Sequence, residues 1–419
     1  MRIALLNDSF PPQIDGVANA VVNYASVLHA HGHKPLVAVP DVPGAVDDYD
    51  YPVLRYQSLD TTKLFGYRAG NPFSPAAVAQ LQEFAPDIIH SHCPIASTLL
   101  ARTLREGTGT PVVFTYHTKF DIDIRTAIRG HLLQNSLITA LVTNIQACDE
   151  VWTVSHGAGE NLRSIGYEGD YTVMENGVDM PRGRADAADI ARAEALCGLR
   201  DDKPVFLFAG RLRWYKGIRL IIEGLAEAER AGADYHMVFV GDGSDREAME
   251  TLCRQAGIMP RCVFTGALQD RSLLRGIYSR ADLFLFPSTF DTNGIVVREA
   301  AACGLGALLV AGSCAAEGVT DGRNGLLMAE NAESLCAQVL FACAHREEVR
   351  ALGQHAQDEL YLSWEESVSR AEKRYAEIIE NRRGQAAKPR RDMFPFLSDV
   401  IEAMIRLREG QKQIWDWLR

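Results

Sequence analysis

The chain has 419 residues, of which 47% are hydrophobic and 23% charged, a composition typical of a folded enzyme. This length exceeds one ordinary hydrophobic core and predicts two domains. The net charge of −11 argues against nucleic acid as a partner. Nine cysteines without a Cys-x-x-Cys pair argue against a disulfide framework or a zinc site, and they favour a reducing compartment.

The first residues, MRIALLNDSF, begin directly with an apolar strand pattern and show no signal-peptide features. No apolar run approaches the roughly 20 residues that span a bilayer. We therefore expect a cytoplasmic protein.

Short apolar runs alternate with segments of helical period along most of the chain. The first strands are predicted at 2–6, 35–39, 87–90, 112–116, 151–154 and 171–174, with a helix over 18–31 that ends near Gly32. The second half repeats this rhythm with strands at 205–209, 236–240, 263–266, 283–287 and 307–311. Strands separated by helices predict an α/β protein with two Rossmann-like, doubly wound parallel sheets. The polar stretch 180–203, rich in alanine and arginine, separates the halves, and we expect it to form the linker.

Candidate functional residues follow the predicted strands, where ligands bind on such sheets. Arg211 and Lys216 place two cations after the strand 205–209, and fixed cations stabilise the charge of a diphosphate leaving group. A solvated basic turn would have the same composition. Asp291 and Glu299 flank Gly294, which opens a predicted helix whose first amides could bind phosphate oxygens. Read alone, these are an acidic N-cap and a surface glutamate.

Two residues of the first half are weaker candidates. Gly16 opens the helix over 18–31 and would let backbone amides approach an anion, although a plain turn explains it as well. His117 ends the strand 112–116 and could handle a proton, although a lone histidine is more often structural. The Asp-Ile-Asp sequence at 121–123, the three histidines at 29, 31 and 33 and the histidine pair at 90 and 92 lack the context of metal sites.

The combination of Arg211, Lys216, Asp291 and Glu299, in this order and at these spacings, resembles glycosyltransferase family 4, whose members are retaining enzymes of the GT-B fold. The resemblance covers about residues 1–380 and includes the segments NGVD at 176–179, VGDG at 240–243 and EGVTDGRNG at 317–325. It implies an N-terminal acceptor-side domain at 1–180 and a nucleotide-sugar-binding domain at 181–360. A crossover helix at 361–380 would return to the first domain.

The resemblance also implies roles for single residues. Arg211 and Lys216 look like the pair that neutralises the donor diphosphate, while Asp291 and Glu299 match the acidic ends of the family's E-x7-E motif and would hold the sugar and the ribose. The segment between them would bind the donor through Thr292, Asn293, Gly294 and Ile295.

Three further positions follow from the same resemblance. Gly16 would close over the diphosphate, His117 would lie near the reacting hydroxyl, and Leu268 would lie where the base is held. Two departures put the donor sugar in doubt, because Asp291 replaces the usual glutamate and Asn293 replaces an aromatic residue or glutamine.

The resemblance implies front-face displacement, in which the leaving phosphate helps to deprotonate the acceptor. It also implies that the nucleotide-sugar is a substrate and that no cofactor or metal is tightly bound. Members of the family most often use UDP-sugars. No obvious carboxylate nucleophile accompanies the motif, which agrees with this mechanism. The segments at 8–17 and 114–118 look like those of diacylglycerol glucosyltransferases, which implies transfer to a membrane lipid. A soluble or polysaccharide acceptor, a nucleotide-sugar epimerase and a nucleotide-binding pseudo-enzyme are the alternatives.

The carboxyl-terminal tail, 381–419, carries nine Lys or Arg against five Asp or Glu, and a helical-period stretch that includes Trp415 and Trp417. Cations with interfacial tryptophans suit peripheral attachment to an anionic membrane surface. Packing on the first domain or on a partner subunit explains the same pattern equally well.

Overall fold

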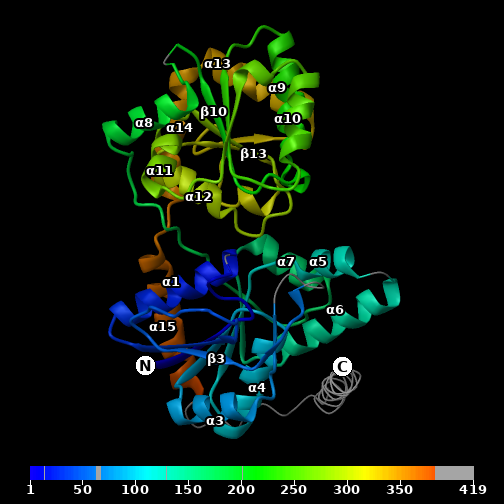
Figure 1. The fold of residues 1–419 in the computed structure, drawn as a ribbon, viewed down its shortest axis with the longest axis vertical. Coiled ribbons are helices and arrows are strands. Elements are labelled where there is room, and N and C mark those ends of the chain that lie inside the picture. The colour runs from blue at the N-terminus through cyan, green and yellow to red at the C-terminus, as the bar shows by residue number, and fades with distance from the viewer. Residues whose placement is uncertain (14, 63–67, 129, 201, 383–419) are drawn as a thin grey trace, which may run out of the picture.

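The computed structural model describes residues 1–13, 15–62, 68–128, 130–200 and 202–382. The carboxyl-terminal tail, for which membrane attachment and packing on protein were both considered, lies outside the described residues from 383 onward. The described residues form two lobes, which lie one above the other in Figure 1, with the first half of the chain in the lower lobe. We call them the N-terminal lobe, which holds the first sheet, and the C-terminal lobe, which holds the second.

The N-terminal lobe is built on a seven-stranded parallel sheet of order β3-β2-β1-β6-β7-β8-β9. Its central strands are buried along their whole length, as apolar runs covered by helices on both faces should be. The strands are β1 (Arg2–Leu6), β2 (Lys34–Pro40), β3 (Val53–Tyr56), β6 (Ile88–Ser91), β7 (Val112–Tyr116), β8 (Glu150–Thr153) and β9 (Thr172–Val173), beside a small antiparallel pair, β4 (Ser58–Leu59) and β5 (Ala69–Gly70).

The C-terminal lobe has a six-stranded parallel sheet of order β12-β11-β10-β13-β14-β15. Its strands are β10 (Val205–Ala209), β11 (His236–Val240), β12 (Cys262–Gly266), β13 (Leu283–Phe286), β14 (Ala307–Val310) and β15 (Leu326–Met328). From β10 the chain adds β11 and β12 on one side of the sheet. It then crosses back to place β13 on the other side of β10, so the strand order reverses between β10 and β13. Such a reversal is where doubly wound sheets bind ligands.

Helices connect successive strands and cover the sheets (Figure 1). The N-terminal lobe contains α1 (Gly16–Ala30), α3 (Pro75–Phe84), α4 (Ala96–Thr108), α5 (Phe120–Ala127), α6 (His131–Gln146) and α7 (His156–Ser164). The C-terminal lobe contains α8 (Ala187–Cys197), η1 (Trp214–Lys216), α9 (Ile218–Arg230), α10 (Arg246–Gln255), η2 (Met259–Arg261), α11 (Arg271–Arg280), α12 (Ile295–Ala302), η3 (Cys314–Ala316), α13 (Ala332–Ala344) and α14 (Arg346–Glu359).

All eleven strands predicted from the apolar runs are present, and four of them, β1, β7, β10 and β11, have the predicted bounds. The strands β3 and β15 escaped prediction because both are short, and β3 is half-exposed, with little apolar pattern to show. The linker prediction for 180–203 was wrong, because α8 fills its centre and packs on α11. The signals were present: Asp186 caps the helix at Asp189, and Gly198 ends it in the left-handed conformation.

The chain crosses between the lobes twice, and the two crossings lie side by side. The amide of Val178 donates to the carbonyl of Leu362 at 2.9 Å, and Gly177 lies so close to Trp364 that a Cβ would meet its backbone nitrogen at 2.3 Å. After the second crossing α15 (Trp364–Arg382) packs on α1 of the N-terminal lobe (Figure 1). No described helix is long and apolar enough to cross a membrane.

Candidate active site

The centre of the candidate site is an ion pair between two residues 75 positions apart. Lys216 Nζ lies 2.5 Å from Asp291 Oδ1, and the hydroxyl of Ser288 donates to Asp291 Oδ2 at 2.5 Å. Both charged side chains are mostly buried, at 14% and 21% exposure. The structure therefore brings together the cation and the carboxylate that were predicted for the diphosphate and the sugar.

Neighbouring strands explain this meeting. Lys216 follows β10 and Asp291 follows β13, and these two strands pair in parallel, so their carboxyl ends share one edge of the sheet. Between them Gly217 packs against the backbone of Pro287, where an added Cβ would lie 2.4 Å from the carbonyl oxygen. Its φ of +76° is also one that side chains rarely adopt. Glycine at position 217 is therefore required for the turn that carries Lys216 to pack against the end of β13.

Glu299, the second acidic residue of the motif, lies on α12 with its side chain 14% exposed. The hydroxyl of Tyr278 donates to its Oε2 at 3.2 Å, and Arg271 lies 3.6 Å from its Oε1. Burial raises the pKa of Glu299, while Arg271 opposes that shift. The carboxylate is thus held in a fixed position by two partners.

The segment between the two acids ends at the start of α12. Gly294 precedes the helix with φ +59°, and an added Cβ would meet Ala315 at 3.0 Å. No side chain caps the first turn, and the amide of Val297 donates to the Gly294 carbonyl at 2.8 Å, so the amides of Ile295 and Val296 are the ones available to an anion. The amide side chain of Asn293 is buried, and neither its nitrogen nor its oxygen has a hydrogen-bond partner among the described residues.

Arg211 and Leu268 stand apart from this centre. The Arg211 side chain is exposed at the turn after β10, and Leu268 is half-buried against the core of the C-terminal lobe after β12. Both follow the carboxyl ends of strands in the same sheet. No hydrogen bond or ion pair joins either side chain to Lys216 or Asp291.

His117 is placed differently from the expected proton-handling group. Its ring is buried, its Nε2 lies 2.9 Å from His92 Nδ1, and its Nδ1 lies 3.5 Å from Asn176 Nδ2. Burial lowers the pKa of His117 to about 3, so the ring is neutral near pH 7. Its two ring nitrogens therefore face other side chains of the protein.

Gly16 is the first residue of α1 and is exposed, with open space around the position of a Cβ. The Asp15 side chain already accepts from the amides of Val17 and Ala18, at 2.9 and 2.8 Å. This cap leaves the amide of Gly16 itself as the one that could meet an anion.

Contacts between the lobes gather around Thr292, which adjoins Asp291. Its hydroxyl donates to the carbonyl of His117 at 2.6 Å, and its carbonyl accepts from the hydroxyl of Ser155 at 2.5 Å. Nearby, Lys119 Nζ donates to the carbonyl of Thr289 at 3.2 Å. The loop that carries Asp291 is therefore hydrogen-bonded to the N-terminal lobe.

A second contact between the lobes involves Glu317, whose carboxylate accepts from the amides of His156 and Gly157, at 2.8 and 2.5 Å, at the start of α7. A carboxylate at this position is stabilised by the partial positive charge of the helix end. The sequence offered no signal for the roles of Ser155 or His92. Asn176 and Glu317 lay in segments noted only for their resemblance.

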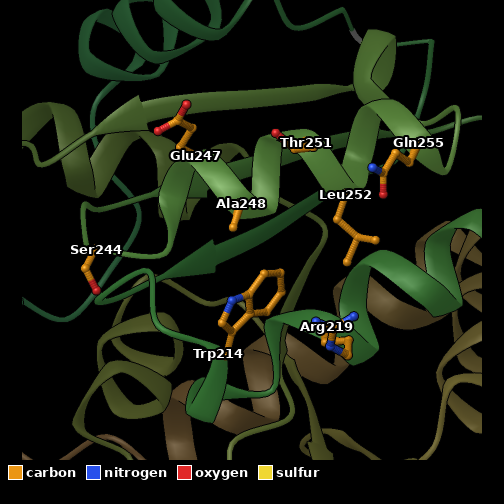
Figure 2. A pocket seen from close by; sticks show the side chains of 8 residues that line it. All are labelled: Trp214, Arg219, Ser244, Glu247, Ala248, Thr251, Leu252 and Gln255. Atoms are coloured by element: carbon orange, nitrogen blue, oxygen red, sulfur yellow. The ribbon is translucent and has the colours of Figure 1, made fainter.

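Within the described part of the chain, no group of three His, Cys, Asp or Glu side chains is arranged to hold a metal ion. A hollow of about 570 Å³ lies elsewhere on the C-terminal lobe, between Trp214, Arg219 and the side of α10 (Figure 2). The Arg219 guanidinium lies 4.6 Å from the centre of the Trp214 ring. None of the predicted site residues lines this hollow.

Comparison with known proteins identifies the family. The model described as Glycosyltransferase Family 4 matches residues 14–182, and the model described as Glycosyl transferases group 1 matches residues 193–359. The chain belongs to glycosyltransferase family 4. A GDP-mannose-dependent alpha-mannosyltransferase of Corynebacterium glutamicum is 27% identical, over 90% of this chain and 89% of the relative. An Alpha-monoglucosyldiacylglycerol synthase of Streptococcus pneumoniae is 23% identical, over 73% of this chain and 70% of the relative.

Solved structures of glycosyltransferases show the same fold. The sucrose-phosphate synthase from Thermosynechococcus elongatus superposes with a TM-score of 0.72 at 20% identity, covering 91% of this chain and 99% of that one. Anabaena Alr3699/HepE, in complex with UDP and glucose, superposes with a TM-score of 0.70 at 18% identity, covering 89% and 99%. The family 4 chain described here therefore has the GT-B fold, as the sequence predicted.

Proposed function

We propose that this glycosyltransferase is a retaining hexosyltransferase that transfers a sugar from UDP-glucose or UDP-galactose to a hydroxyl of a membrane lipid such as diacylglycerol. The observation that carries the proposal is the pairing of Lys216 with Asp291 at the adjoining ends of β10 and β13. A cation and a carboxylate held together at the point where the strand order reverses suit a substrate that is part diphosphate and part sugar.

Donor binding would exchange the partner of Lys216. A diphosphate carries more negative charge than one carboxylate, so it competes for the ammonium group, and the exposed Arg211 supplies a second cation. Asp291, released from Lys216, can then accept hydrogen bonds from hydroxyls of the donor sugar. The amides of Ile295 and Val296 at the start of α12 and the carboxylate of Glu299 complete the donor side.

In the front-face reaction that we adopt, the bond between the anomeric carbon and the diphosphate oxygen breaks. The acceptor oxygen attacks the same face, and its proton passes to the leaving phosphate. Lys216 and Arg211 stabilise the charge that develops on the diphosphate. The neutral ring of His117 faces His92 and Asn176, so we assign it the task of fixing the carbonyl that holds Thr292.

The lipid acceptor is supported by the names of relatives. Alpha-monoglucosyldiacylglycerol synthases of Streptococcus pneumoniae and Acholeplasma laidlawii are 23% and 22% identical. The alpha-mannosyltransferase of Corynebacterium glutamicum, which covers more of this chain, favours GDP-mannose as a second candidate donor. We take the transfer to be independent of metal.

The test is a screen of UDP-glucose, UDP-galactose and GDP-mannose, each with diacylglycerol vesicles, with a soluble sugar acceptor or with no acceptor. We expect nucleotide release and a glycolipid product only with vesicles, unchanged by a chelator. Conversion of the donor without an acceptor would identify an epimerase instead, and binding without turnover would identify a pseudo-enzyme. A glycosyl-enzyme adduct in the mass spectrum would contradict front-face displacement.

Lys216→Ala provides the variant for this screen. Removing the ammonium should lower turnover by at least about a hundredfold, because a charge-stabilising contact is worth about 3 kcal/mol in a transition state. Lys373→Ala, which removes an exposed lysine of α15, is the matched control. Near-normal transfer by Lys216→Ala would overturn the site.

A further inference from the structure

Three leucines on one helix are exposed and form an apolar surface outside the hydrophobic core. Among the described residues, large hydrophobic side chains are exposed at seven positions, and three of these lie at the start of α6: Leu132 at 87%, Leu133 at 53% and Leu137 at 37%. At 100° per residue all three project within about 140° of the helix circumference. The opposite side of α6 carries Gln134 and Ile138, which are buried.

The leucines lie at the end of α6 that is far from its contact with the start of α4. Near its carboxyl end, Asn144 already bonds to the carbonyl of Pro94, just before the start of α4, at 2.6 Å. Leu132 lies twelve residues earlier, about 18 Å along the helix axis. Figure 1 shows α6 reaching the edge of the N-terminal lobe. Gln134 ties this end of the helix to α5 through the carbonyl of Ile128 at 2.7 Å.

The charge of the same region is unusual for this protein. Residues 124–148 contain no Asp or Glu, although the whole chain has a net charge of −11, and they include two arginines and one histidine. Arg125, whose carbonyl accepts from Gln134 of α6 at 3.3 Å, and His131, which directly precedes Leu132, are both exposed. Exposed leucines on a segment that carries arginine and no acidic residue suit an anionic bilayer. A water-facing helix surface would normally carry charged residues in place of the leucines.

The position of this surface ties it to the reaction. The helix α5 begins at Phe120, three residues after His117, and α6 follows it directly. Lys119, which lies between His117 and Phe120, contacts the C-terminal lobe at Thr289. The exposed end of α6 is therefore joined by one short helix to the junction of the two lobes.

We propose that Leu132, Leu133 and Leu137 insert into the interfacial layer of an anionic phospholipid bilayer and that Arg125 and His131 contact its head groups. This α6 surface would dock the enzyme beside the lipid that it modifies. The inference rests on the proposed lipid acceptor for its purpose, but the binding itself is measurable without any sugar transfer.

The test is flotation of the full chain with vesicles of phosphatidylcholine, alone or mixed with phosphatidylglycerol. We expect the wild type to float with the mixed vesicles and the triple variant L132Q/L133Q/L137Q to bind at least about tenfold more weakly, because each inserted leucine contributes apolar area. Val46→Gln and Leu196→Gln, which change exposed apolar residues far from α6 in the sequence, are the matched controls and should bind as the wild type does.

Three results would overturn the inference. The wild type could fail to float, the triple variant could float as well as the wild type, or the triple variant could change only the oligomeric state, which would make this surface an interface between two copies of the chain. Failure of the proposed lipid acceptor looks different, because the wild type would still float but yield no glycolipid. Circular dichroism of the triple variant checks that it is folded.

Discussion

The neutral histidine at the junction of the lobes makes the stability of the N-terminal lobe depend on pH. Burial lowers the pKa of His117 from 6.5 to about 3, and its side chain is only 6% exposed. Between these two values the unfolded chain binds a proton that the folded chain does not. The contribution of this ring is therefore fully present above pH 6.5 and is lost as the pH falls towards 3.

The magnitude follows from linkage. Each pH unit below 6.5 costs about 1.4 kcal/mol per neutral histidine, so His117 alone should cost about 2 kcal/mol at pH 5. Burial also lowers the pKa of His90 and of His92. The wild type should therefore lose stability steeply over this range.

The variant His117→Gln isolates one ring. Its free energy of unfolding relative to the wild type should rise by about 2 kcal/mol between pH 7.5 and pH 5, because glutamine has no proton to gain. Urea denaturation at constant ionic strength, followed by the fluorescence of buried Trp152 in the N-terminal lobe, measures this difference. His29→Gln, which removes an exposed histidine of the same lobe, is the control. Parallel pH curves for the wild type and His117→Gln would refute the neutral ring.

Three other predictions follow from the site. Gly217→Ala should lower the free energy of unfolding by about 2 kcal/mol or more, since its Cβ would meet the Pro287 carbonyl at 2.4 Å; Gly16→Ala is the control, and equal urea midpoints would contradict the packing. Glu299→Gln should raise KM for the donor about tenfold with less effect on kcat, a split that steady-state kinetics would show or exclude. Glu317→Ala should speed hydrogen exchange at the start of α7, and unchanged protection would argue against this contact.

The sequence was most informative where local patterns decide the structure. The strand β10 could be placed at Val205–Ala209 because five apolar residues stand between Pro204 and Gly210, and the candidate residues after it could be placed at the same edge of a sheet. The helix signals of α8 were equally local, but its alanine-rich composition favoured a linker. That error came from weighing composition above the cap at Asp186.

Side-chain partners could not be predicted in the same way. The pairing of Lys216 with Asp291 depends on β10 lying next to β13, and strand order is set by long-range packing. His117 could be located at a strand end, but its direction depends on His92 and Asn176, which are 25 and 59 residues away. Both histidines end neighbouring strands, so the sheet register decides their contact.

The loop after β13 links donor binding to the arrangement of the lobes. Asp291 pairs with Lys216 of its own lobe. The next residue, Thr292, donates its hydroxyl to the carbonyl of His117, and its carbonyl accepts from the hydroxyl of Ser155, both in the other lobe. A nucleotide-sugar that draws Lys216 away from Asp291 therefore acts on a loop in which the next residue, Thr292, is hydrogen-bonded to the N-terminal lobe. Because interactions through one short loop are coupled, replacing Ser155 with alanine should change donor affinity although its hydroxyl bonds only to the Thr292 carbonyl and caps α7.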